Sequence, residues 1–240
     1  MERTEFTVGQ IRPVECLKEG WALIKDEYWI LFALSIVGAT IAGISMYILL
    51  GPMVCGIFLA YLRKVDGGRV VFDDLFAGFK YFKQTILIVI LFVVPIIAYV
   101  AAMTITVYLP LIISAVRGQR VSGGELLAAF ALGVAVELVV AIIMVCIHSV
   151  LIFAFPLVID RGLSNWDAIK LSFRAVIKNL RGVGGFMALQ IGISLAGMMA
   201  FCVGVYFTIP ILTALLLVIY RRIFPRLDGA GELDVPPVAA

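Results

Sequence analysis

Four long runs of apolar residues dominate the hydrophobic pattern of the chain. They cover Trp29–Leu62, Gln84–Val116, Leu126–Ile159 and Gly182–Tyr220. None of the 19 Lys and Arg residues lies in these runs, and Glu137 is the only one of the 16 Asp and Glu residues that does. A charged group near the middle of a bilayer costs about 3 kcal/mol or more. The pattern therefore predicts helices that cross a membrane.

The length of a run indicates how often it crosses. About 20 helical residues span a bilayer core, so the first run, with 34 residues, and the fourth, with 39, are too long for one crossing. Proline disfavours helix at the residue before it. We therefore predict a hairpin in the first run, with its turn within residues 46–52 near Gly51–Pro52. A second hairpin is predicted in the fourth run, with its break at Ile209–Pro210.

The second and third runs are each predicted to cross once, which gives six crossings in total. Pro95 is expected to kink the second run and Leu109–Pro110 to end its helix, while Phe155–Pro156 is expected to end the third. An alternative with eight crossings, in which both runs also fold as hairpins, stays open. Neither run has a turn signal at its middle, which favours six.

The charges predict the orientation. With six crossings, 17 of the 19 Lys and Arg residues fall on one side of the membrane. Positively charged loops stay in the cytoplasm, so both termini are expected there. The composition agrees, because 63% of the residues are hydrophobic, against about 45–50% in a soluble domain. The net charge of +3 is too small to indicate nucleic-acid binding.

Three amphipathic stretches each precede a crossing. They are Val14–Tyr28, Val71–Lys83 and Trp166–Leu180, and their apolar residues recur at alternating spacings of three and four. This spacing places them on one face of a helix, and we expect short helices in the cytoplasmic interface. The third stretch opens with Ser164 and Asp167, which is typical of a capping box.

Two parts of the chain resemble each other. Residues 21–25 (WALIK) are similar to residues 174–178 (RAVIK), and Pro52 and Pro210 are each followed eleven residues later by an arginine. This predicts a pseudo-repeat of two similar hairpins around a central pair of crossings. The fold class is therefore an all-α polytopic bundle, with one domain over residues 1–226 and a cytoplasmic tail over 227–240 that we expect to be disordered.

Three polar residues inside the apolar runs are candidates for a site. Glu137 is predicted near mid-membrane, and His148 lies eleven residues further on, close to the same helix face. Gln190, in the following run, is the third. Intramembrane ionisable groups often serve proton or ion paths. The alternative is a neutral Glu137 that hydrogen-bonds a neighbouring helix and serves packing.

A second candidate is basic. Lys170, Arg174 and Lys178 are spaced four apart on the predicted polar face of the third amphipathic helix, with Arg181 one turn on. Each gains about 1 kcal/mol near anionic headgroups, so these residues are predicted to contact anionic lipid. The alternative is ordinary positively charged loop sequence without lipid selectivity.

Motifs of known catalytic or metal sites are missing from the sequence. It has one histidine and no P-loop, nucleophile elbow or paired-cysteine motif. We therefore expect a protein that is not an enzyme and that has no cofactor or metal. Stripes of small residues every four positions, such as Gly192, Ala196 and Ala200, allow close helix packing inside the chain or in a homo-oligomer.

Five short motifs occur in order along the chain, namely GPMVCG at 51–56, DLFAGF at 74–79, FPLVIDR at 155–161, WDAIKLS at 166–172 and GVYFTIP at 204–210. They resemble motifs of uncharacterised bacterial six-helix membrane proteins and of the membrane domain attached to some glycerophosphodiester phosphodiesterases. The resemblance implies a six-helix fold in the bacterial cytoplasmic (inner) membrane. No phosphodiesterase domain is expected in the chain, so that activity is not implied.

Two functions are consistent with the sequence. The first is a non-enzymatic inner-membrane protein that organises lipids or a membrane partner protein through its interfacial helices. The second is a small transporter or channel with a polar path near Glu137 and His148.

Overall fold

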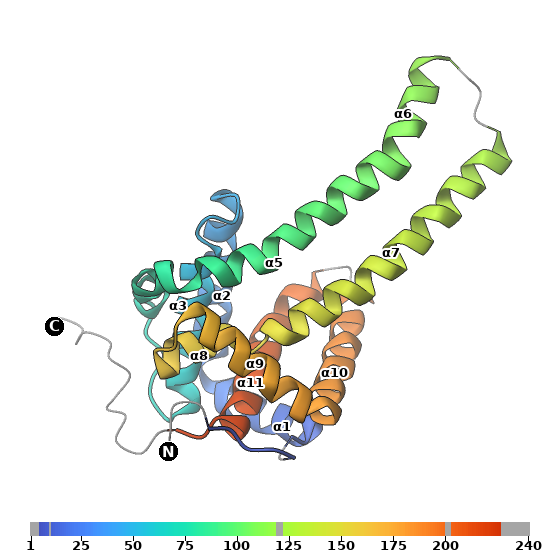
Figure 1. Ribbon diagram of the computed structural model, residues 1–240. Coiled ribbons are helices and arrows are strands. Elements are labelled where there is room, and N and C mark those ends of the chain that lie inside the picture. Colours follow the sequence, from blue (N-terminus) through green and yellow to red (C-terminus); the bar gives the residue numbers. More distant parts are fainter. Residues whose placement is uncertain (1–4, 10, 119–121, 200–202, 227–240) are drawn as a thin grey trace. The chain divides into compact units, whose positions relative to one another are not determined.

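The structure is a computed structural model that describes residues 5–9, 11–118, 122–199 and 203–226, and every regular element in these ranges is a helix (Figure 1). The predicted tail over 227–240 lies outside the described residues. The chain divides into two compact units, the first formed by residues 1–89 with 150–240 and the second by residues 90–149. Each unit is described by itself.

The first unit contains two 3-10 turns and most of the helices. Its elements are α1 (Pro13–Ile24), η1 (Lys25–Glu27), α2 (Tyr28–Ile44), α3 (Leu50–Val65), α4 (Asp74–Ala77), η2 (Gly78–Tyr81), α8 (Ala154–Arg161), α9 (Asn165–Lys178), α10 (Leu180–Met199) and α11 (Gly204–Ile223). The second unit holds most of α5 (Phe82–Met103) and α7 (Gly123–Leu151), with the π-helix η3 (Thr104–Tyr108) and α6 (Leu109–Val116) between them.

Five helical segments are long and apolar enough to cross a membrane. They are Pro13–Ile44, Asp74–Val116, Gly123–Arg161, Leu180–Met199 and Gly204–Ile223. The described residues therefore agree with the predicted all-α fold and with a membrane protein. The sixth crossing and the pseudo-repeat stay predictions.

The first apolar run folds as a pair of antiparallel helices, α2 and α3. The Tyr61 hydroxyl lies 3.1 Å from the Ser35 hydroxyl, which joins the two helices in their buried contact. The turn occupies residues 45–49, where Met46 and Tyr47 adopt positive φ angles of 51° and 66°. Pro52 does not break the helix, because it lies in the first turn of α3, where backbone N–H groups have no intrahelical partner.

The break predicted at Ile209–Pro210 is wrong. Pro210 lies inside α11, and the two helices of this run are separated between Met199 and Gly204 instead. Helices in membranes tolerate an internal proline, since neighbouring helices and side chains compensate for the lost hydrogen bond.

Two further predicted helix ends are also wrong. The helical path continues through Pro110 to Val116, and the π-helix η3 directly precedes this proline. A π-helix shifts the hydrogen-bond pattern by one residue. The helical backbone therefore continues past Pro110, although this proline has no N–H to donate. The third run breaks at residues 152–153, and Pro156 lies in the first turn of α8.

The C-terminal halves of α3 and α11 form the centre of the core of the first unit. Both halves are buried on all sides, with exposed fractions of 2% or less for Leu59, Ala60, Tyr61, Leu62, Leu215, Leu217, Ile219 and Tyr220. A helix that is apolar and buried on every face belongs to the centre of a protein. The other helices of the unit pack around this pair.

Glycines bring two short helices against the central pair. A Cβ atom on Gly20 of α1 would lie 3.2 Å from the backbone nitrogen of Leu215, and one on Gly56 of α3 would lie 2.0 Å from the carbonyl oxygen of Leu75. The amphipathic stretch over 71–83 is therefore fixed against α3 by Leu75 and Gly78. Its other face leaves Phe72, Phe76 and Phe79 exposed. The apolar side chains of this stretch, which the sequence predicts on one face, therefore divide between a buried face and an exposed face.

We expect Gly56→Ala to destabilise the first unit by about 3 kcal/mol, because the new methyl group meets the backbone of Leu75 and not a movable side chain. Gly43→Ala is the matched control, since a Cβ at Gly43 of α2 meets nothing within 4 Å. The measurement is thermal unfolding of the purified protein in detergent, followed by circular dichroism. Equal melting temperatures for the two variants would contradict the close contact.

Candidate functional site

Helix α9 carries the predicted basic residues and begins at a cap that the sequence predicts. The Asp167 N–H donates to the Ser164 hydroxyl oxygen at 3.3 Å, and the Ser164 hydroxyl donates to the Asp167 carboxylate at 2.6 Å. An oxygen at this position satisfies one of the free N–H groups of the first turn. The predicted capping interaction is confirmed, and it fixes the start of α9 at Asn165.

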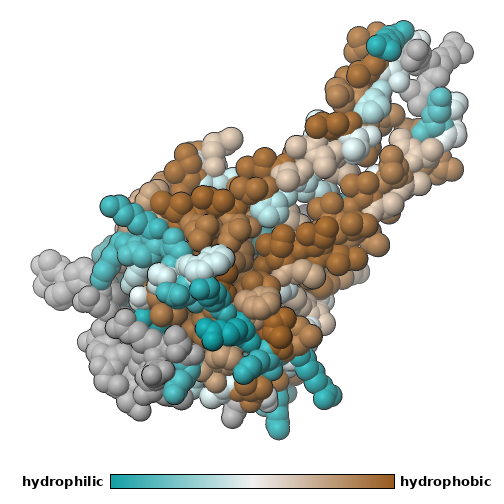
Figure 2. Space-filling model, in the orientation of Figure 1, coloured by the Kyte–Doolittle hydropathy of each residue, from teal (hydrophilic) through white to brown (hydrophobic). Residues whose placement is uncertain are grey.

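The circumference of α9 divides into three sectors. One faces the protein and contains the buried residues Ala168, Ile169, Leu171, Ser172, Ala175 and Val176. The second is exposed and apolar, with Trp166, Phe173 and Ile177 about half exposed. The third is exposed and basic, with Lys170, Arg174 and Lys178. At 3.6 residues per turn the two exposed sectors are adjacent, and Figure 2 shows hydrophilic side chains along α9 bordered by hydrophobic ones.

The cations of this basic sector have different partners. The Lys170 ammonium lies 5.4 Å from the ring centroid of Trp166, and that of Lys178 lies 5.8 Å from the ring of Phe6. In the part of the chain that the structure describes, Arg174 has no carboxylate or aromatic partner. Asp167 is the single acidic residue of α9, and its bond from the Ser164 hydroxyl leaves its negative charge in place. The three cations of the sector therefore outnumber the acidic residues of the helix.

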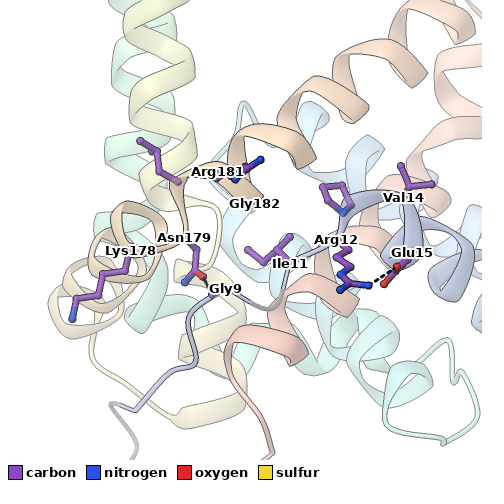
Figure 3. Close-up of a pocket in the computed structure, with 11 residues that line it drawn as sticks. Gly9, Ile11, Arg12, Val14, Glu15, Lys178, Asn179, Arg181 and Gly182 are labelled. Carbon is purple, nitrogen blue, oxygen red and sulfur yellow. Dashed lines mark hydrogen bonds and ion pairs between the residues drawn. The ribbon is translucent and has the colours of Figure 1, made fainter.

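Arg181 lies apart from this sector, because α9 ends at Lys178 and Arg181 belongs to the first turn of α10. It lines a groove of about 460 Å³ between the N-terminal segment and the junction of α9 with α10. Figure 3 shows that Arg12 turns toward Glu15, 3.0 Å away, and that Lys178 extends away from Gly9. The basic groups do not converge, so the groove is not assigned a ligand.

The N-terminal segment contributes contacts that sequence reasoning did not find. The Thr7 N–H donates to the carbonyl of Ile223 at 2.8 Å, and the Asn179 side chain accepts from the Gly9 N–H at 2.9 Å and donates to the Thr7 carbonyl at 3.3 Å. These bonds satisfy a terminal carbonyl of α11. The partners are about 170 to 216 residues apart, and nothing in the local sequence marks them.

A cluster of ion pairs, which the sequence did not indicate either, joins three elements. Arg221 at the end of α11 binds both carboxylate oxygens of Asp66, at 2.8 and 2.6 Å. It also binds both oxygens of Asp160 on α8, at 2.8 and 2.7 Å, and the Tyr220 hydroxyl donates to Asp160 at 2.7 Å. The three charged side chains are only 10–13% exposed. We call Arg221, Asp66, Asp160 and Tyr220 the Arg221 cluster.

The second unit contains two of the predicted intramembrane polar residues. Glu137 of α7 is hydrogen-bonded to the Tyr99 hydroxyl of α5. His148 Nε2 lies 3.4 Å from the carbonyl oxygen of Phe92, and the rings of these two residues are 4.1 Å apart. Both residues thus connect α5 with α7. Gln190 lies half-buried on α10 in the first unit, so a common site of the three residues stays a prediction.

Among the described residues, no group of three or more His, Cys, Asp and Glu side chains could hold a metal ion. The comparisons with known proteins gave no match to a family model, to a curated protein or to a solved structure. The resemblance to bacterial six-helix membrane domains therefore stays a prediction.

The Arg221 cluster predicts a large effect of a single substitution. Arg221→Gln leaves the carboxylates of Asp66 and Asp160 close together without a cation, and we expect a loss of about 3–5 kcal/mol in unfolding free energy. Arg12→Gln is the control, because its pair with Glu15 is exposed and is worth about 1 kcal/mol at most. Chemical denaturation in detergent measures both. Equal losses would show that the cluster is not a major source of stability.

The contact between Tyr99 and Glu137 predicts a coupling between two substitutions. In a double-mutant cycle with Tyr99→Phe and Glu137→Leu, we expect a coupling energy of about 0.5–2 kcal/mol, as for hydrogen bonds between membrane helices. The measurement is unfolding in mixed micelles. Strict additivity would mean that the two side chains do not interact in the folded protein.

Proposed function

We propose that the chain is a non-enzymatic, multi-pass protein of the bacterial inner membrane that organises anionic lipid at the cytoplasmic surface through the exposed face of α9. The observation that carries this proposal is the division of α9 into a buried sector, an exposed apolar sector and an exposed basic sector. The helix pairs, the distribution of charge along the chain and the exposed face of α9 support it.

The topology of the proposal has six crossings. Three helix pairs support it, because each pair returns the chain to the side from which it left. The helices α2 and α3 pack together, as do α10 and α11, and α5 meets α7 where Phe92 contacts His148. The helix α3 has 16 residues and a length of about 24 Å, slightly less than a bilayer core. A local thinning of the bilayer accommodates such a helix at a modest cost.

The proposed orientation places both termini in the cytoplasm. In a six-crossing topology, the connection that contains Arg117 and Arg120 lies on one side, and the segments that contain the other 17 Lys and Arg residues lie on the opposite side. Positive charge in short loops remains on the cytoplasmic side during insertion. The helix α9 connects α8 to α10 on this side.

The exposed face of α9 fits a lipid surface. Trp166, Phe173 and Ile177 supply apolar area for the boundary between headgroups and acyl chains, and the adjacent cations reach the phosphates. Each cation near an anionic surface gains about 1 kcal/mol. The groove described above is lined by residues 9, 11–15 and 178–182, so it gives no support to a transport path near Glu137.

The test compares two variants that remove the same charge. Lys170→Gln, Arg174→Gln and Lys178→Gln together should lower the anionic lipid retained by the purified protein about 10-fold or more. The control carries Lys18→Gln, Lys25→Gln and Arg69→Gln, three exposed cations outside α9, and should retain lipid like the wild type. Bound lipid is quantified by mass spectrometry after purification in mild detergent. Equal retention by both variants would refute the proposed role of α9.

A further inference from the structure

We infer that Arg174 is the residue of α9 that recognises the lipid headgroup, and that its guanidinium binds two oxygens of one headgroup phosphate, which an ammonium of the same charge does not do. This inference rests on the proposed function and names the ligand class of the same face. It follows from the orientation of α9, the partners of the neighbouring cations and the geometry of a guanidinium group.

The packing of α9 holds Arg174 outward. On the opposite side of the helix, the buried Ser172 hydroxyl donates to the carbonyl of Val150 and accepts from the Phe153 N–H at 3.2 Å. Ala175 and Val176 are also buried there. Since these contacts fix the rotation of α9 about its own axis, the Arg174 side chain remains on the exposed face.

The lysines on either side of Arg174 are already engaged. Lys170 is held over the Trp166 ring and Lys178 over the Phe6 ring, where the negative face of the ring attracts a cation. Arg174 lies between them, one helical turn from each, without a carboxylate or aromatic partner among the described residues. Its guanidinium is therefore the group of this face that is available to bind a ligand.

The chemistry of arginine defines the ligand. A guanidinium presents parallel N–H groups that bind two oxygens of one anion, which a lysine ammonium cannot reproduce. A phosphodiester offers two non-bridging oxygens in this arrangement, as a carboxylate does. The adjacent apolar sector of Trp166, Phe173 and Ile177 points to a lipid as the source, because free phosphate has no chains to cover these side chains.

The test keeps the charge constant. The full-length protein is titrated in detergent with phosphatidylglycerol, and the bound lipid is measured by native mass spectrometry. Arg174→Lys should bind this lipid about 10-fold more weakly than the wild type, because an ammonium cannot reproduce the paired contact of the guanidinium. Lys170→Arg, which also keeps the charge, should bind the lipid like the wild type and is the matched control.

Each outcome decides the inference. If Arg174→Lys binds phosphatidylglycerol like the wild type, charge alone suffices and Arg174 has no special role, while the proposed function stands. If inorganic phosphate displaces phosphatidylglycerol from the wild type, the ligand is free phosphate and the lipid assignment is wrong. If the triple glutamine variant retains lipid like the wild type, the proposed function fails as well. Melting temperatures of the variants identify any that are misfolded, and for such a variant Arg174→Gln replaces Arg174→Lys.

Discussion

The structure of the first unit depends on the contact of Arg221 with two carboxylates. Asp66 follows α3, Asp160 belongs to α8 and Arg221 ends α11, so one guanidinium fixes the ends of three elements. In this mostly buried position its attraction to the carboxylates is stronger than in water. It also offsets the desolvation of the two acids. The central helices α3 and α11 are thereby held at one end, and the short helices pack around them.

Much of the fold could be predicted from the sequence because lipid imposes a simple rule. The exclusion of charge located the apolar helices, and the spacing of Trp166, Phe173 and Ser164 predicted α9 with its cap. Prolines misled the prediction at Pro110 and Pro210, since both lie within continuous helical paths. A proline indicates a missing hydrogen bond, but the sequence alone does not show whether neighbouring helices compensate for it.

The candidate site could be predicted only in part, because several of its contacts join residues that are distant in the chain. The basic spacing on α9 is local and is visible in the sequence. The position of Phe6 over Lys178, and of Asp66 and Asp160 around Arg221, depends on residues distant in the chain. Glu137 was identified as a polar residue in an apolar run, but its partner Tyr99 lies on another helix. The hydrophobic periodicity of a helix does not show which residue of another helix its side chains meet, because that depends on the tertiary structure.

The contact of Thr7 with the end of α11 has a consequence for biosynthesis. Residues 5–9 are made long before α11, yet the carbonyls that Thr7 binds belong to Arg222 and Ile223. The second unit is continuous in sequence and can pair its helices while the chain is still growing. The first unit is interrupted by it and cannot close until α11 has been synthesised. Thr7 must therefore wait until α11 has been translated before it can form these bonds.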